Sequence, residues 1–180
     1  MFFEFPTFNF GDYHLREIDA RNDADLFYKY ITTNEVSKFL GQDSIPKTAA
    51  HATAELQYWA NLFYSRRSYY WAIANQNNDI IGTAGFNHVS QQHARAELSY
   101  DLNPEYWGKG IMINTLYKIL EYSFNTLELV RIQATVGQHN VRSIKLLENL
   151  NFRKEGELAC YEKLQGKHYD FYMYAITRRP

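Results

Sequence analysis

The chain has 180 residues, which suits one domain that buries roughly 70% of the surface of its unfolded form. Hydrophobic residues make up 46% and aromatic residues 17% of the sequence, a composition typical of a globular protein with an aromatic-rich core. A net charge of -1 argues against a general nucleic-acid binder, which would carry a basic excess. The single cysteine, Cys160, excludes an internal disulfide and a multi-cysteine zinc site, and it fits a reducing cytoplasm.

Targeting, metal and repeat signals are absent from the sequence. Residues 1–6 have no basic region and include Glu4 and Pro6, so we expect neither a signal peptide nor a membrane span there. The six histidines are scattered without the spacing of metal ligands, and the sequence predicts no metal site. No repeat or linker composition interrupts the chain, so residues 1–180 are expected to form one domain.

The first half of the chain shows both periods of secondary structure. Residues that alternate between polar and apolar favour strands, whereas apolar residues three or four apart favour helices. Asn22 or Asp23 is expected to cap a short helix that contains Leu26 and Ile31. A turn-rich stretch at 75–79, between two strands, is typical of a hairpin. The expected elements are strands over 13–18, 69–74 and 80–86, and a helix over 48–64.

The second half begins with a strand over 94–102 that leads into a glycine-rich turn. An amphipathic helix follows, with Ile111, Leu116 and Ile119 on one face. The remaining expected elements are a strand over 129–136, a helix over 140–150, and two closing strands over 152–161 and 169–176.

The glycine-rich turn is the most informative stretch. Gly108 and Gly110 can adopt left-handed backbone angles and carry no side chain, so a ligand can approach the amides of residues 109–112 closely. These amides have no partner within the helix, and the helix dipole adds about half a positive charge. We therefore expect a site for a phosphate or pyrophosphate. Glycine in a strand-to-helix turn is also common for steric reasons, so the motif alone leaves both interpretations open.

Two other phosphate motifs do not fit this turn. A dinucleotide fingerprint would have a third glycine at position 113, which is Ile, and a nucleoside-triphosphate loop would continue with Lys and Ser or Thr after Gly110. The turn resembles instead the phosphate loop of the Gcn5-related N-acetyltransferase (GNAT) superfamily. That loop has the pattern Gln/Arg-x-x-Gly-x-Gly/Ala and binds the pyrophosphate of coenzyme A. Here it reads Glu105-Tyr-Trp-Gly108-Lys-Gly110, with Glu105 at the Gln/Arg position.

The resemblance extends over nearly the full chain and is strongest to the RimJ/RimL-type branch. One departure is Asn151, which stands where the family has glycine, and Asn is the next best residue for a left-handed helix terminus. The residues that carry the resemblance are Leu15-Arg16, Trp71-Ala-Ile73, Gly82, Ala96-Glu97, Tyr100, residues 104–110, Arg131-Ile-Gln-Ala134, Asn140-Val-Arg-Ser143, residues 146–152 and Glu155-Gly156.

This resemblance implies a mixed α+β fold. Its central sheet would have about seven mostly antiparallel strands, splayed at a V-shaped cleft, with about four helices on its faces. The strand at 97–102 would part from the strand at 130–136, so that the pantetheine arm pairs with the free edge. The expected partners are acetyl-CoA as cosubstrate and an amine acceptor that attacks the thioester directly in a ternary complex. No metal, nucleic acid or membrane is expected, and the protein would be a cytoplasmic monomer or homodimer.

The resemblance also assigns roles to residues. Glu97 would be the general base, acting through a water, although a cross-strand salt bridge with Arg95 or Arg131 is an alternative. Many members protonate the thiolate with a tyrosine at the position that is Leu147 here, so Ser143 would take that role unless it bonds its own backbone. The expected cosubstrate contacts are Tyr100, Asp101, Leu102, Trp107, Gly108, Lys109, Gly110, Ile111, Met112, Asn140 and Ser143.

The acceptor is the open part of the interpretation. Deprotonating an α-amine of pKa near 7.8 costs about 1 kcal/mol at pH 7, against about 4.6 kcal/mol for a lysine near 10.4. This difference favours a protein N-terminal α-amine. The alternatives are a small amine such as a polyamine or antibiotic, or a catalytically silent CoA-binding sensor. The candidates for an acidic lining of the acceptor cleft are Asp43, Glu55 and Glu97, and His88 and His93 are further candidates for its wall.

Overall fold

The computed structural model describes residues 4–178, so residues 1–3 and 179–180 lie outside the described range. Within this range there are eight strands and five α-helices, one more of each than expected, and two short 3-10 helices. The strands are β1 (Phe8–Phe10), β2 (Tyr13–Arg16), β3 (Tyr70–Ala74), β4 (Ile80–Ser90), β5 (Arg95–Leu102), β6 (Arg131–Gly137), β7 (Arg153–Leu164) and β8 (Lys167–Thr177). The helices are α1 (Ala20–Ile31), α2 (Asn34–Ser37), α3 (Ala49–Tyr64), α4 (Ile111–Asn125), α5 (Val141–Asn149), η1 (Gln42–Ser44) and η2 (Pro104–Tyr106).

All strands belong to one sheet with the order β1-β2-β3-β4-β5-β6-β8-β7. Every neighbouring pair is antiparallel except β5 and β6, which are parallel. These two strands pair over only three positions, from Arg95 opposite Arg131 to Glu97 opposite Gln133. Beyond Glu97 they diverge, and this confirms the predicted splay of the sheet.

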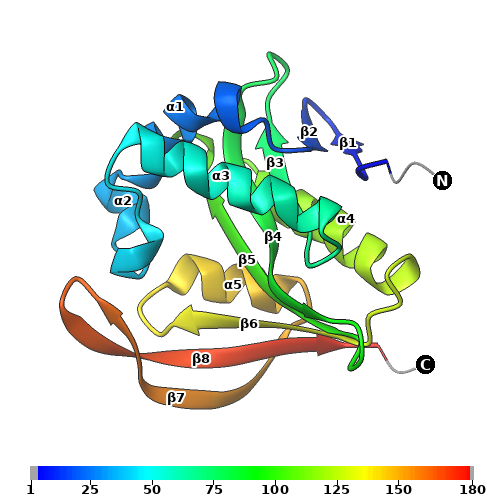
Figure 1. Ribbon diagram of the computed structural model, residues 1–180. Coiled ribbons are helices and arrows are strands. Elements are labelled where there is room, and N and C mark those ends of the chain that lie inside the picture. Colours follow the sequence, from blue (N-terminus) through cyan, green and yellow to red (C-terminus); the bar gives the residue numbers. More distant parts are fainter. Residues whose placement is uncertain (1–3, 179–180) are drawn as a thin grey trace.

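The sheet separates two hydrophobic cores, because successive side chains of a strand point to opposite faces. On β3, Trp71 and Ile73 belong to the core under α4 and α5, whereas Tyr70 and Ala72 belong to the core under α1 and α3. Figure 1 shows α1, α2 and α3 gathered over the upper part of the molecule, and β6, β7, β8 and α5 forming the lower part. The divergence of β5 from β6 lies between these parts.

Several local predictions are confirmed and one is wrong. The helix predicted over 48–64 is α3, which the side chain of Thr48 caps. Asn151 has a left-handed φ of 64°, as its position after α5 required. The cap of α1 is neither Asn22 nor Asp23 but Asp19, whose carboxylate accepts from the amides of Arg21 and Asn22. The helix therefore begins earlier, and Asp23 is free to turn inward.

The strand β1 and the helix α2 were not expected, because three or four residues are too few to show a period. Among residues 4–178 no helix has both the length and the apolar character needed to cross a membrane.

Candidate active site

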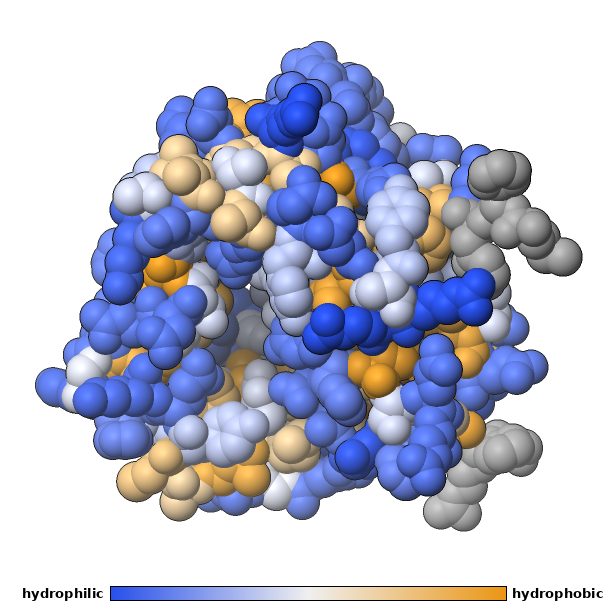
Figure 2. Space-filling model, viewed as in Figure 1, coloured by the Kyte–Doolittle hydropathy of each residue, from blue (hydrophilic) through white to orange (hydrophobic). Residues whose placement is uncertain are grey.

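A cleft of about 790 Å³ lies where β5 and β6 diverge. Figure 2 shows the surface hollowed between the upper and lower parts of the molecule, where Figure 1 has α2 above α5. One end of the cleft is lined by the glycine-rich turn and by α5. The other end is lined by the segment 36–44 and by the β7–β8 hairpin. The divergent sheet thus creates one cleft with two chemically different ends.

The glycine-rich turn has the geometry of an anion site. Gly108 and Gly110 have φ values of 76° and 73°, the left-handed region that favours glycine. Gly110 is the N-cap of α4 and supplies no side chain to the first helical amides, which have no partner within the helix. A Cβ at Gly108 would meet nothing within 4 Å, so the turn has open space beside it. The positive φ by itself accounts for glycine at position 108, and the open space beside it would also admit a ligand, so the structure is compatible with both interpretations of the turn.

The other residues predicted to contact the cosubstrate in this turn, Trp107, Lys109, Ile111 and Met112, differ in what they expose to a ligand. The side chains of Ile111 and Met112 are buried in the core, so only their backbone amides are available to a ligand. The indole of Trp107 donates a hydrogen bond of 2.8 Å to the carbonyl oxygen of Leu102 and thereby fixes the turn to the end of β5. The ammonium of Lys109 lies 4.9 Å from the centre of the Tyr106 ring.

Two cations at this end were not identified from the sequence. The guanidinium of Arg142 lies 4.3 Å from the centre of the Trp107 ring, and Arg142 and Lys145 both line the cleft. Both belong to α5. Their charges complement an anionic ligand. The sequence could have indicated them, because residues three apart lie on the same face of a helix, and this helix begins just after Asn140.

Tyr100 and Ser143 meet across the cleft. The phenol oxygen of Tyr100, on β5, is 2.7 Å from the Oγ of Ser143, on α5. The side chain of Asn140 caps α5 by accepting from the Ser143 amide at 3.2 Å. Burial raises the pKa of Tyr100 to about 12, although the bond to Ser143 lowers it. Leu147, which stands where many family members have a tyrosine, is fully buried. In the described chain, the phenol that bonds Ser143 is that of Tyr100, on β5.

The side chain of Asp101 is committed to the fold. One of its oxygens accepts from the phenol of Tyr30 at 2.6 Å, and the other accepts from the hydroxyl of Thr83 at 2.5 Å. The first oxygen also accepts from the Thr83 amide. Burial raises the pKa of this carboxyl to about 6, and the three hydrogen bonds partly offset that rise. Any contact of Asp101 with a cosubstrate must therefore come from its backbone.

Glu97 faces the cleft from the last paired position of β5. In residues 4–178 its carboxylate has no hydrogen bond or ion pair, because Arg131 is bound instead to Glu155 at 2.6 Å. The salt-bridge interpretation of Glu97 is therefore wrong. Asp43 and Glu55, the other acidic candidates, are not among the described residues that line the cleft.

Glu162 is the acidic residue that sequence reasoning missed. It lies on β7, lines the far end of the cleft and is half-buried. Burial raises the pKa of its carboxyl, and no described residue bonds it. The sequence signal that could have located it was the glycine of Gln165-Gly166, which is typical of a two-residue hairpin turn. In the structure both residues have positive φ values, 48° and 85°. Such a turn extends the preceding strand to Leu164 and places Glu162 on its inward face. The candidates His88 and His93 do not line the described cleft.

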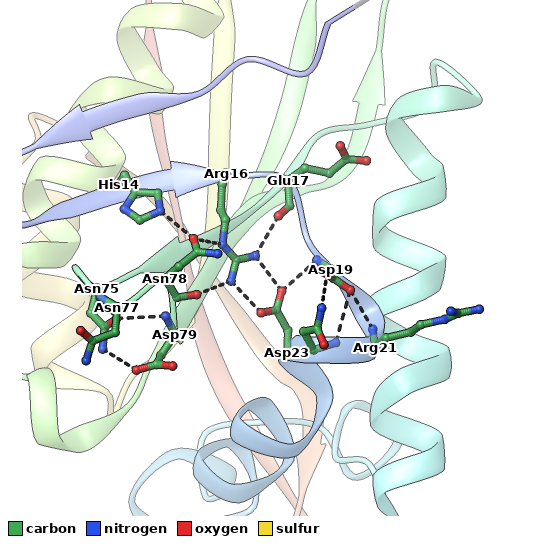
Figure 3. Close-up of polar contacts among 11 residues, drawn as sticks. His14, Arg16, Glu17, Asp19, Arg21, Asp23, Asn75, Asn77, Asn78 and Asp79 are labelled. Atoms are coloured by element: carbon green, nitrogen blue, oxygen red, sulfur yellow. Dashed lines mark hydrogen bonds and ion pairs between the residues drawn. The ribbon is translucent and has the colours of Figure 1, made fainter.

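A second, smaller pocket is occupied by a structural ion pair (Figure 3). Arg16 donates to both carboxylate oxygens of Asp23, at 2.6 and 2.8 Å, to both the side-chain and backbone oxygens of Asn78, and to the carbonyl of Glu17. All five donor hydrogens of the guanidinium are thereby used. The pocket joins β2, α1 and the β3–β4 turn and leaves no donor of Arg16 for a ligand.

The cleft combines an open helix N-terminus at Gly110 with two glutamates, Glu97 and Glu162, that have no hydrogen bond or ion pair in the described chain. The family model for the acetyltransferase (GNAT) domain matches residues 13–153. The chain is 36% identical over 167 residues to the uncharacterized N-acetyltransferase p20 of Bacillus licheniformis, with 92% of each chain covered. It is 32% identical over 120 residues to the ribosomal protein uS5-alanine N-acetyltransferase of Escherichia coli, covering 65% of this chain and 62% of that protein.

Among solved structures, the ribosomal-protein-S5-alanine acetyltransferase of Vibrio fischeri superposes with a TM-score of 0.86 at 25% identity, covering 97% of this chain and 100% of that one. The chain belongs to the GNAT acetyltransferase family and resembles its RimJ/RimL-type members. It is an acetyl-CoA-dependent N-acetyltransferase. In the part of the chain that the structure describes, no group of three or more His, Cys, Asp or Glu is placed to hold a metal ion.

Proposed function

We propose that this enzyme acetylates the α-amine of a protein amino terminus. The observation that carries the proposal is that two carboxylates without a cationic partner in the described chain, Glu97 and Glu162, line the cleft. Carboxylates without a cationic partner inside the protein favour a cationic substrate. The relatives that act on ribosomal-protein alanine support a protein terminus as that substrate.

The residues of the chain fit acetyl-CoA as the cosubstrate. The amides of residues 109–112 would hold the pyrophosphate, and Arg142 and Lys145 would complement its charge. The free edge of β5 beyond Glu97 would bind the pantetheine arm, assisted by Asn140. Acetyl-CoA supplies the activated acetyl thioester.

The two walls of the cleft would perform different proton transfers. Glu97 accepts the proton of the acceptor ammonium through a water, so that the free amine can attack. We assign Ser143 as the donor to the departing thiolate, and Tyr100, bonded to it at 2.7 Å, holds its hydroxyl in place. Because a thiolate has a pKa near 8.5, proton donation contributes less than proton removal from the amine.

Glu162 would attract and orient the acceptor rather than take its proton. It lies at the far end of the cleft, where the segment 36–44 and the β7–β8 hairpin face each other. A charge-assisted hydrogen bond from the acceptor ammonium to this half-buried carboxylate contributes about 1.5–3 kcal/mol to binding.

The acceptor class is tested with two peptides of one sequence that begin with alanine. One has a free amino terminus and a blocked lysine, and the other has a blocked terminus and a free lysine. Deprotonation of the lysine costs about 3.5 kcal/mol more at pH 7, so kcat/KM should be higher for the first peptide. Faster acetylation of the second would overturn the assignment. Release of CoA only with polyamines or aminoglycosides would favour a small-amine enzyme, and no release with any acceptor would favour a CoA-binding sensor.

A further inference from the structure

Gly41 lies in the segment 36–44, which forms one side of the acceptor end of the cleft. Its backbone angles, φ -60° and ψ 147°, are available to any residue, so the conformation does not require glycine. The space beside Gly41 is instead limited by one flexible side chain, that of Glu162. A Cβ added at Gly41 would lie 2.6 Å from the Oε1 of Glu162, closer than two such atoms can approach. The Glu162 carboxylate therefore lies where a side chain at position 41 would begin.

The position of this segment is fixed by contacts that do not involve Glu162. The ring of Phe39 stacks on the imidazole of His139, with centroids 5.5 Å apart and an interplanar angle of 24°. His139 in turn lies against Tyr169 of β8, 4.8 Å away between ring centres. Val36 is buried in the core under α1 and α3. Because Val36 and Phe39 hold the segment just before Gly41, and the nearest atom belongs to a flexible side chain, a side chain at position 41 would move the Glu162 carboxylate and not the backbone.

We propose that Gly41 is a positioning residue for the acceptor, because it admits the Glu162 carboxylate to the place where that group meets the acceptor ammonium. The inference rests on the proposed function of Glu162. It adds that acceptor recognition depends on a residue that contributes no side chain to the cleft. Figure 1 shows the two elements concerned, with α2 and the turn below it facing the tip of the β7–β8 hairpin.

The test is a double-mutant cycle on the full chain with Gly41→Ala and Glu162→Gln. Steady-state constants are measured for acetyl-CoA and for the alanine peptide with the free amino terminus. Glu162→Gln should lower kcat/KM for the peptide about tenfold or more, through KM. Gly41→Ala should lower it severalfold, with KM for acetyl-CoA unchanged. In the Glu162→Gln background, Gly41→Ala should have no further effect, because the group it displaces no longer carries a charge.

Gly156→Ala is the matched control. Gly156 lies on β7, has no left-handed φ, and a Cβ there would meet nothing within 4 Å. It should behave as wild type. The melting temperature of Gly41→Ala should be equal to or slightly above that of wild type, because alanine restricts the unfolded chain at a compatible site.

Three outcomes would overturn the inference. A wild-type kcat/KM for Gly41→Ala beside a weakened Glu162→Gln would show that the carboxylate reaches its place regardless of residue 41. Equal losses from Gly41→Ala in both backgrounds would show that the segment acts by itself. A Glu162→Gln variant with wild-type constants would remove the role of Glu162, while acetylation of the peptide by the wild-type enzyme would leave the proposed reaction standing.

Discussion

The glycine-rich turn allows a prediction in which the cost to the fold and the cost to the ligand are separated. Gly108 has a φ of 76°, and the left-handed region costs a residue with a Cβ about 1–2 kcal/mol. A Cβ at this position meets no atom within 4 Å, so Gly108→Ala adds no steric clash within the chain. The free energy of unfolding without ligand should therefore fall by about 1–2 kcal/mol and no more.

Gly108→Ala should also reduce the stability that the protein gains when acetyl-CoA binds. At 100 times its dissociation constant the cosubstrate adds about 2.7 kcal/mol to the stability of the wild-type protein. For a chain of this length that gain raises the melting temperature by roughly 5–10 °C. The added methyl group of Gly108→Ala lies in the open space beside the helix amides. If it weakens binding tenfold, the gain at the same ligand concentration falls to about 1.4 kcal/mol.

The assay is thermal unfolding of each variant with and without millimolar acetyl-CoA. Gly11→Ala is the control, since Gly11 also has a positive φ, 55°, with nothing within 4 Å, and lies in the β1–β2 turn outside the cleft. It should lose a similar amount of stability and keep the full ligand shift. A full shift in Gly108→Ala, or an equal reduction in both variants, would refute the placement of the phosphate site at this turn.

Two further predictions concern the base and the structural ion pair. Glu97→Gln should lower kcat, measured from initial rates, by about 10²-fold or more. The Kd of acetyl-CoA, measured by calorimetry, should stay unchanged. A loss of this size in Glu162→Gln but not in Glu97→Gln would assign the general base to Glu162 on β7. Arg16→Met leaves the 3%-exposed Asp23 carboxylate without its cation and should cost about 3–5 kcal/mol in denaturant unfolding. Arg21→Met, at an exposed residue, should change stability by less than about 0.5 kcal/mol, and equal effects of the two arginine variants would contradict the assigned role.

Features set by short stretches of sequence were predicted well. The positive φ values of Gly108, Gly110 and Asn151 depend on residues within a few positions, and the structure confirms them. The order of the elements also followed from local periodicity. The failure at the cap of α1 has a tertiary cause. Asp23 is a good capping residue by type, but its carboxylate is bound by Arg16 from β2, a contact that the local sequence does not show.

The acceptor end of the cleft depends on contacts that periodicity cannot supply. The predicted strand over 152–161 ended before Glu162, because the two-residue turn at Gln165-Gly166 was not recognised. Gly41 is informative only when Glu162 is known to lie against it, 121 positions later in the chain. The contact between Tyr100 and Ser143 likewise joins a strand to a helix. Backbone features of the glycine-rich turn were therefore accessible from the sequence, whereas contacts between residues far apart in the chain were not.

The divergence of β5 from β6 explains why one strand can serve both substrates. Beyond Glu97, alternate residues of β5 point to opposite faces, with Tyr100 toward α5 and Asp101 toward α1. The bonds of Asp101 to Tyr30 and Thr83 hold the end of β5 to the upper part of the molecule, which keeps its other edge free. The glycine-rich turn, α5, the segment 36–44 and Glu97 of β5 all line the cleft beside this free edge. If the proposed assignment holds, Gly108→Ala should change the affinity for acetyl-CoA, and Glu162→Gln should change the KM of the acceptor peptide while the KM of acetyl-CoA stays the same.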